Sequence, residues 1–277
     1  MLSSPGVSHG SYSEAVMSRD KSMSCLNLAA GAAEILLALL TVFLAASLAS
    51  SPDPSVSLVS EAIIAPDLAL QTFESQAARQ LSELAACSAS TLIEATLSDT
   101  SQWGKYELRR DYVAPKTLRF TPVHFEGDRF VKNNFITRLL RVEVEQVENE
   151  RSSQTALNAR NYKFNYKGIT EIDGRRVHIF QVKPRQKRPG LFNGRIFLEV
   201  ETGHIRRAQG RLVKSGSFFV KRIDFVQDYD DFGAFIFPVH LHSVAQLRLF
   251  GRAVVDVWYR DYEPVAIPAT VAASNDH

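Results

Sequence analysis

The sequence is poor in the residues that cross-link small folds. It has two cysteines, Cys25 and Cys87, among 277 residues. Cys25 lies in a segment that we expect to be removed, so Cys87 is interpreted as a small buried apolar residue without a disulfide partner. A chain of this length can bury roughly 70% of the surface of its unfolded form, so it needs neither a disulfide nor a metal for stability. The lack of disulfides does not exclude export.

The usual catalytic spacings are also missing. The sequence has no G-x-S-x-G elbow, no H-E-x-x-H, no Walker A loop, no paired C-x-x-C and no G-x-G-x-x-G that opens a helix. We therefore expect no enzymatic activity and no cofactor. The formal net charge is only +2, which predicts no general attraction to nucleic acid or to an anionic membrane.

An apolar run is the main feature of the N-terminal part. Residues 35–49 read ILLALLTVFLAASLA, follow Arg19 and Lys21, and precede a cluster of serine, proline and aspartate. Basic residues, an apolar run of roughly 7–15 residues and small residues at its end are typical of a secretory signal peptide. The sequence predicts cleavage after Ala49.

An uncleaved membrane anchor is the alternative for residues 1–49. A transmembrane helix needs about 20 apolar residues, and this segment reaches that length only by burying Glu34. Cleavage is therefore favoured, and the protein is expected in the periplasm or cell envelope, membrane-anchored if the segment is kept. The true start is left open between Met1, Met17 and Met23.

Residues 50–104 are predicted to form a helical N-terminal region. They are rich in alanine, leucine, glutamine and glutamate, and Leu81, Leu84 and Cys87 recur near helical spacing. Pro66 is expected to divide this stretch into two helices, because proline breaks a helix interior.

Residues 105–264 are predicted to form an antiparallel sheet domain. Apolar and polar residues alternate in many short runs, and Asp173-Gly174 is a hairpin signal. The connections are too short for parallel crossovers, which indicates a meander. Residues 134–148 fit an inserted helix, although part of this segment fits a strand equally well. Residues 265–277 are expected to be a flexible tail.

Such a sheet twists, curls and buries one face. The fold class predicted is α+β: a large curved antiparallel β-sheet, or half-barrel, covered by helices and preceded by an N-terminal hydrophobic helix. The aromatic residues that alternate along its strands could line an apolar cavity, although aromatics in strands are first of all core residues. The cavity candidates are Tyr162, Phe164, Tyr166, Phe235 and Phe237.

Three polar clusters have simpler explanations than a site. His240 and His242 share one strand face and are weak metal candidates, because zinc needs a third ligand and none has diagnostic spacing. A basic loop could hold a phosphate or a lipid head group, but a solvated hairpin loop is simpler. An acidic stretch lacks the spacing of a calcium loop. The basic residues are Lys183, Arg185, Lys187 and Arg188, and the acidic ones are Asp228, Asp230 and Asp231.

Residues 161–262 resemble a known group of exported bacterial proteins. The segments that carry the resemblance include NYKFNYKG at 161–168, GRIFLE at 194–199 and FPVHLHSVAQLRLFGRAVVDVWYRDYE at 237–263. They are similar to proteins described as outer-membrane lipoprotein-sorting-like, which are related in fold to the periplasmic carriers LolA and LolB. The resemblance implies a half-barrel that holds acyl chains, with a lipid or lipidated protein as partner near a membrane. The alternative is a structural module that binds an envelope protein.

Overall fold

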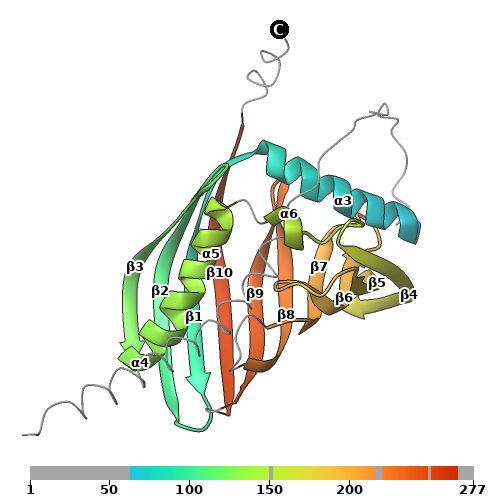
Figure 1. Cartoon of the computed structure of the whole chain (residues 1–277). Coiled ribbons are helices and arrows are strands. Elements are labelled where there is room, and N and C mark those ends of the chain that lie inside the picture. Colours follow the sequence, from blue (N-terminus) through green and yellow to red (C-terminus); the bar gives the residue numbers. More distant parts are fainter. Residues whose placement is uncertain (1–62, 150–151, 216–219, 249–250, 268–277) are drawn as a thin grey trace, which may run out of the picture.

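The computed structural model describes residues 63–149, 152–215, 220–248 and 251–267. The predicted signal peptide, its alternative as an anchor, the predicted N-terminal hydrophobic helix and most of the predicted tail lie outside these residues. In the described part, ten strands form one sheet with helices over one face and across one end (Figure 1).

All neighbouring strands of the sheet for which pairing is described are antiparallel. Their spatial order is β3-β2-β1-β10-β9-β8-β7-β6-β5-β4. The strands are β1 (Leu84–Leu97), β2 (Gln102–Val113), β3 (Thr117–Gly127), β4 (Tyr162–Ile172), β5 (Arg175–Pro184), β6 (Phe192–Glu199), β7 (Ile205–Leu212), β8 (Val220–Phe232), β9 (Phe235–Leu247) and β10 (Arg252–Ala266). The predicted meander is confirmed for β4 to β10, which pair in sequence order.

The hairpin predicted at Asp173-Gly174 is also confirmed. These two residues join β4 to β5, and both have positive φ angles, 49° and 78°. Two consecutive positive φ angles define the two-residue turn that matches the right-handed twist of a hairpin.

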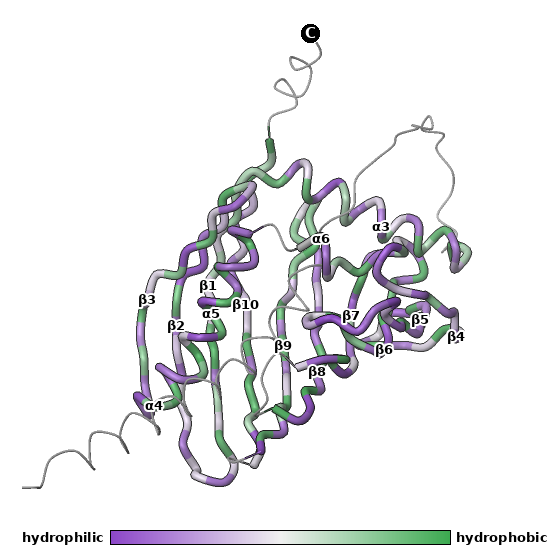
Figure 2. The backbone as a smooth tube through the Cα atoms, in the orientation of Figure 1, coloured by the Kyte–Doolittle hydropathy of each residue, from purple (hydrophilic) through white to green (hydrophobic). Residues whose placement is uncertain are grey.

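One face of the sheet is mainly apolar. A single row of paired residues crosses all ten strands on this inner face. Its members are buried on every strand except the two edge strands, β3 and β4. Polar and apolar residues alternate along the strands (Figure 2), which places many of the polar residues on the other face. From β3 to β4 the row is Phe125, Tyr106, Ile93, Val257, Leu241, Gln227, Ala208, Ile196, Phe180 and Tyr166.

Two paired glycines lie in the next row of the inner face. Gly194 of β6 pairs with Gly210 of β7. A Cβ atom on Gly194 would lie 1.9 Å from the carbonyl oxygen of Gln209, and one on Gly210 would lie 2.9 Å from the ring of Phe192. The strands therefore approach more closely here than any side chain allows, and the Phe192 ring covers the gap. Glycine at such a position permits a sharp local bend.

The first helix of the described part is α3 (Pro66–Glu83). Pro66 occupies its first turn, where the missing N–H would have no partner in any case. Residues 63–65 are not helical, so a helix begins at Pro66 as the predicted break requires, and the first of the two predicted helices falls mostly on residues outside the described part.

The predicted helical region is wrong beyond Glu83, because Leu84–Leu97 is strand β1. Cys87, Ala89, Thr91, Ile93 and other alternate residues of this segment are buried. That period of two was present in the sequence, but alanine and serine at many positions hid it behind a helical spacing of leucines. Burial between β2 and β10 outweighs the helix propensity of alanine.

Helix is the correct alternative for 134–148. A short helix α4 (Arg129–Val131), a π-helix η1 (Lys132–Ile136) and α5 (Thr137–Glu148) follow one another, and a further turn, α6 (Ser152–Thr155), precedes β4. Phe130 and Val131, within the predicted sheet domain and ahead of its predicted helix, belong to α4. Glycine at position 104 of β2 lets this segment pack closely against the strand. A Cβ atom there would lie only 3.3 Å from the Val131 side chain.

Side chains of helix α3 form hydrogen bonds to a part of β9 that has no neighbouring strand on one side. Strand β10 pairs with β9 only as far as Trp258 and His240, so the start of β9 has no β10 neighbour. There the side-chain amide of Gln80 donates to the Ile236 carbonyl at 3.0 Å and accepts from its N–H at 2.8 Å. Gln76 donates to the Ala234 carbonyl at 2.8 Å. Two glutamines thus replace a neighbouring strand and hold α3 in place.

Candidate functional site

The five aromatic cavity candidates do not form one group. Tyr162 is wholly buried in the main core, where its oxygen accepts a hydrogen bond from the Phe192 N–H, and Phe164 packs partly buried against the same core. Tyr166 is 42% exposed near the β4 edge. Its hydroxyl donates to Nδ1 of His178 at 3.3 Å, because Nε2 of that ring donates to the Ile64 carbonyl.

Phe235 and Phe237 lie in a second, smaller cluster where β9 and β10 part. The Phe237 ring stacks on Tyr262 with 4.5 Å between centroids, and Cys87 is buried beside them. Burial raises the pKa of the Cys87 thiol to about 11, so it remains a neutral apolar group. Tyr162 and Phe164 belong to the main core, whereas Phe235 and Phe237 belong to the second cluster. A single cavity lined by all five aromatics stays a prediction.

A charged pair interrupts the apolar inner face under α5. Arg110 of β2 lies 3.0 Å from the carboxylate of Glu143, whose side chain is 2% exposed. Burial raises the pKa of Glu143, while the guanidinium of Arg110 acts against that rise by favouring the carboxylate. A buried pair of this kind fixes the position of α5 over β2 more than it adds stability.

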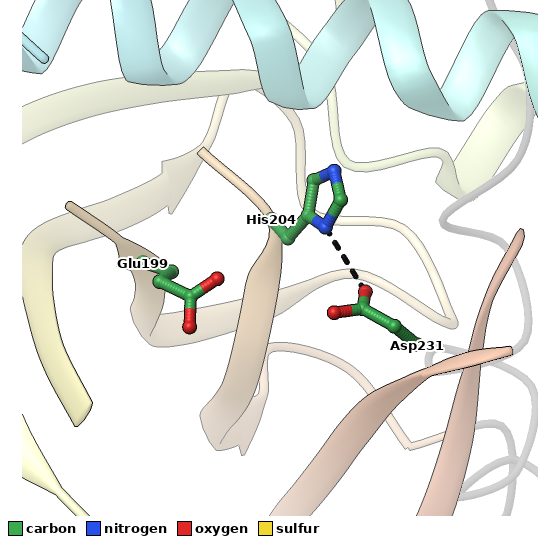
Figure 3. A group of neighbouring side chains, drawn as sticks. All are labelled: Glu199, His204 and Asp231. Carbon is green, nitrogen blue, oxygen red and sulfur yellow. Dashed lines mark hydrogen bonds and ion pairs between the residues drawn. The ribbon is translucent and has the colours of Figure 1, made fainter. Parts of the chain in front are cut away.

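A group of metal-ligating residue types lies at the ends of β6, β7 and β8. Single ligand atoms of Glu199, His204 and Asp231 lie within 4.8 Å of one another, and His204 points at Asp231 (Figure 3). The guanidinium of Arg206 already bonds both carboxylates, at 2.7 and 2.5 Å. Because a guanidinium occupies the cation position, these residues fit an internal ion network better than a metal centre.

This network gives a pH-dependent contribution to stability. Burial alone would raise the pKa of Glu199, but hydrogen bonds from Arg206 and Thr202 outweigh it and hold this pKa below its ordinary value. The contribution is therefore complete above the unfolded pKa of about 4.3 and is lost as the pH falls through the folded value. We expect the stability difference between wild type and Glu199→Gln, measured by urea unfolding, to shrink from pH 7 to pH 3. A difference that is constant with pH would contradict this account.

His240 and His242 share one face, as predicted, and that face is the outer one. Their ring nitrogens lie 3.2 and 2.8 Å from the same oxygen of Asp256, and His240 stacks on Trp258. The carboxylate of Asp256, on the neighbouring strand, is a hydrogen-bond partner for both imidazoles, so their shared orientation does not require a metal.

The basic loop and the acidic stretch are mostly used within the fold. Arg185 donates to the carbonyls of Ala159 and Tyr162, and Arg188 donates to Asn161. Each of the three aspartates of the acidic stretch pairs with an arginine. These contacts favour the simpler explanations, a surface loop and a charged turn.

A groove of about 510 Å³ with a mixed polar and apolar lining lies over β10, β1, β2 and β3. Ser88, Ser90, Arg109, Trp258 and Arg260 are among its lining residues. Arg109 pairs with Asp111 at 2.9 Å and with Glu263 at 3.5 Å. Alternation places the side chains of Ser88 and Ser90 opposite to the buried Ala89 and Thr91, so this groove belongs to the outer face.

The described residues contain no helix of the length and hydropathy that a membrane crossing requires. Helix α3 is the longest of the described helices, with 18 residues, and it carries charged and amide side chains along its length.

A family described as a family of unknown function, DUF5686, matches residues 153–259, and no curated protein matches the sequence. Three solved structures are similar to this chain. A DUF1329 family protein from Desulfovibrio piger shares 10% identity at a TM-score of 0.38, over 72% of this chain and 90% of its own. A putative outer membrane lipoprotein-sorting protein domain from Vibrio parahaemolyticus shares 8% at 0.39, over 72% and 92%. A LolA superfamily protein from Nitrosomonas europaea shares 11% at 0.36, over 75% and 97%. Two of these three are named for lipoprotein sorting or the LolA superfamily.

Proposed function

We propose that this protein is a non-catalytic binding protein of the cell envelope. It holds an apolar ligand, an acyl chain or the lipid of a lipoprotein, on the inner face of the curved sheet. The observation that carries the proposal is the row of paired inner-face residues that crosses all ten strands and is apolar or aromatic at every position except Gln227. An apolar surface of this extent is the kind of wall from which ligand sites are built.

The described helices lie at the two sides of that surface. Helix α5 packs on β3 and η1 on β1 and β2, whereas α3 contacts β6. The inner residues of β8, β9 and β10, such as Ile223, Ala245 and Val255, lie between them and are buried. A ligand on this face must therefore replace contacts that now bury these side chains.

Helix α3 covers part of the inner face with few apolar side chains, and a ligand that displaces it must also replace the hydrogen bonds of Gln76 and Gln80 to residues 234–236. Of its buried residues, only Ala69 and Phe73 are apolar, and the others are Gln76 and Gln80. A void of about 10 Å³ remains beneath it, lined in part by Ile205 and Tyr229. A helix with so narrow an apolar stripe gains less from burial than an ordinary amphipathic helix.

The second candidate is an interaction module that binds an envelope protein. The outer groove favours it, because Trp258 lies there beside Arg109 and Arg260. Tryptophan and arginine are the residue types most enriched at the energetic centres of protein interfaces.

Titration with a fluorescent fatty acid separates the two candidates. The proposal predicts saturable binding that an unlabelled acyl chain displaces. The control variant Trp258→Ala, which alters only the outer face, should bind the probe with unchanged affinity. Absence of binding, or its loss in Trp258→Ala, would argue against the inner face and for the outer groove.

A further inference from the structure

Two buried hydroxyl groups on the inner face have no hydrogen-bond partner among the residues that the structure describes. They are Oγ1 of Thr91 and the phenol oxygen of Tyr259, and the two residues are 4% and 3% exposed. Thr91 of β1 and Tyr259 of β10 are direct cross-strand partners. Directly opposite residues of an antiparallel pair have Cβ atoms about 4.5–5.5 Å apart on one face. The two residues are therefore neighbours on the inner face, and the phenol oxygen of Tyr259 stands further from the sheet than Oγ1 of Thr91.

Their surroundings are apolar along the sheet. Leu108 of β2 pairs with Thr91 on its other side, and Ile93 pairs with Val257 in the next inner row. None of these side chains can donate or accept a hydrogen bond. A buried polar group without a partner is rare in folded proteins, so these two hydroxyls require an explanation.

The nearest charges add no net charge to this place. Tyr259 is close enough to Glu143 and Arg110 for both to act on its pKa, which burial raises most. Arg110 and Glu143 neutralise each other at 3.0 Å. A further ionised carboxylate here would be buried without a cation of its own, which is costly, whereas a neutral oxygen would not be.

We propose that Thr91 and Tyr259 form a polar subsite that binds the neutral oxygen of an otherwise apolar ligand, such as an ester carbonyl or a hydroxyl. Both hydroxyls donate to this oxygen, which offers two lone pairs, and the chain of the ligand follows the apolar row. The inference rests on the proposed function, and it adds that acyl esters and fatty alcohols bind better than the free acid or a plain hydrocarbon of the same length.

The test compares ligands and variants in one displacement assay on the full-length protein. A fatty acid methyl ester and a hydrocarbon of equal length each displace the fluorescent fatty acid from wild type, Tyr259→Phe and Thr91→Val. We expect each variant to bind the ester roughly three- to tenfold more weakly, the effect of one lost hydrogen bond. Affinity for the hydrocarbon should not change. The Tm of the ligand-free variants should be no lower than that of wild type, because an unpaired buried group has been removed.

Tyr262→Phe is the matched control. Its hydroxyl donates to the Pro238 carbonyl at 2.7 Å, so it is already used within the protein. This variant should have a lower Tm and an unchanged preference for the ester.

The possible results separate the two proposals. If no apolar probe binds to wild type, the proposed function fails. If the probe and the hydrocarbon bind but the ester gains nothing, or if Tyr259→Phe and Thr91→Val leave its affinity unchanged, then only the subsite is overturned. In that case, the hydroxyls are paired by buried water.

Discussion

Gly194→Val is expected to destabilise the protein by more than about 3 kcal/mol, the upper part of the usual range for overpacking. The first atom of the new side chain would lie 1.9 Å from the Gln209 carbonyl oxygen and 2.7 Å from the Cα of Gly210. Both are backbone atoms of β7, so no rotamer change relieves the contact. Either β6 and β7 separate, or the sheet loses its bend there. Urea unfolding and the yield of soluble protein would measure the effect.

Asn193→Val is the control for this variant. Asn193 precedes the glycine in β6 and is exposed, so the same β-branched side chain meets no backbone there. We expect its stability to remain within about 0.5 kcal/mol of wild type, as for other surface substitutions. Equal effects of the two substitutions would show that β-propensity, and not the close approach of the strands, explains the loss.

Arg110→Met is expected to lower the free energy of unfolding by about 3–5 kcal/mol at pH 7, the usual cost when one partner of a buried ion pair is removed. Glu143 would remain nearly fully buried under α5, with no cation beside it. Its pKa, already raised by burial, would rise further in the variant, so protonation at lower pH should recover part of the loss. Urea unfolding at pH 7 and pH 5 measures both effects.

The double variant Arg110→Met with Glu143→Leu distinguishes a buried charge from lost packing. It removes both charges and keeps apolar volume, so we expect it to be much closer to wild type than the single variant. A single variant that loses less than about 1 kcal/mol, or a double variant no better than the single one, would mean that the pair is solvated.

The antiparallel meander could be predicted because its strands alternate regularly and end in strong turn residues. Asp173-Gly174 is an example, since both residues adopt the positive φ angles that the turn requires. Strand β1 could not be predicted in the same way. Its sequence, LAACSASTLIEATL, has small residues at buried and exposed positions alike, so neither period stands out. Its state is decided by pairing with β10, which lies far away in the chain.

The inner-face site also could be predicted from the sequence only in part. The aromatic candidates were found by alternation, but their distribution over two clusters follows from the point where β9 and β10 part. The sequence did not identify Thr91 and Tyr259 as site residues, because only the pairing of β1 with β10 brings them together and no local sequence pattern predicts that pairing. The signal peptide over 1–49 and the periplasmic or envelope location remain predictions from the apolar run.

Native mass spectrometry of the full-length protein purified from an expression host with a lipid-containing envelope tests the central claim most directly. The account predicts a population with one bound lipid, retained under gentle ionisation and released when the protein is unfolded. Lipid extraction should identify it as an acyl ester. A mass that matches the polypeptide alone in every charge state, together with no uptake of an added acyl ester, would contradict the claim that the inner face binds an apolar ligand.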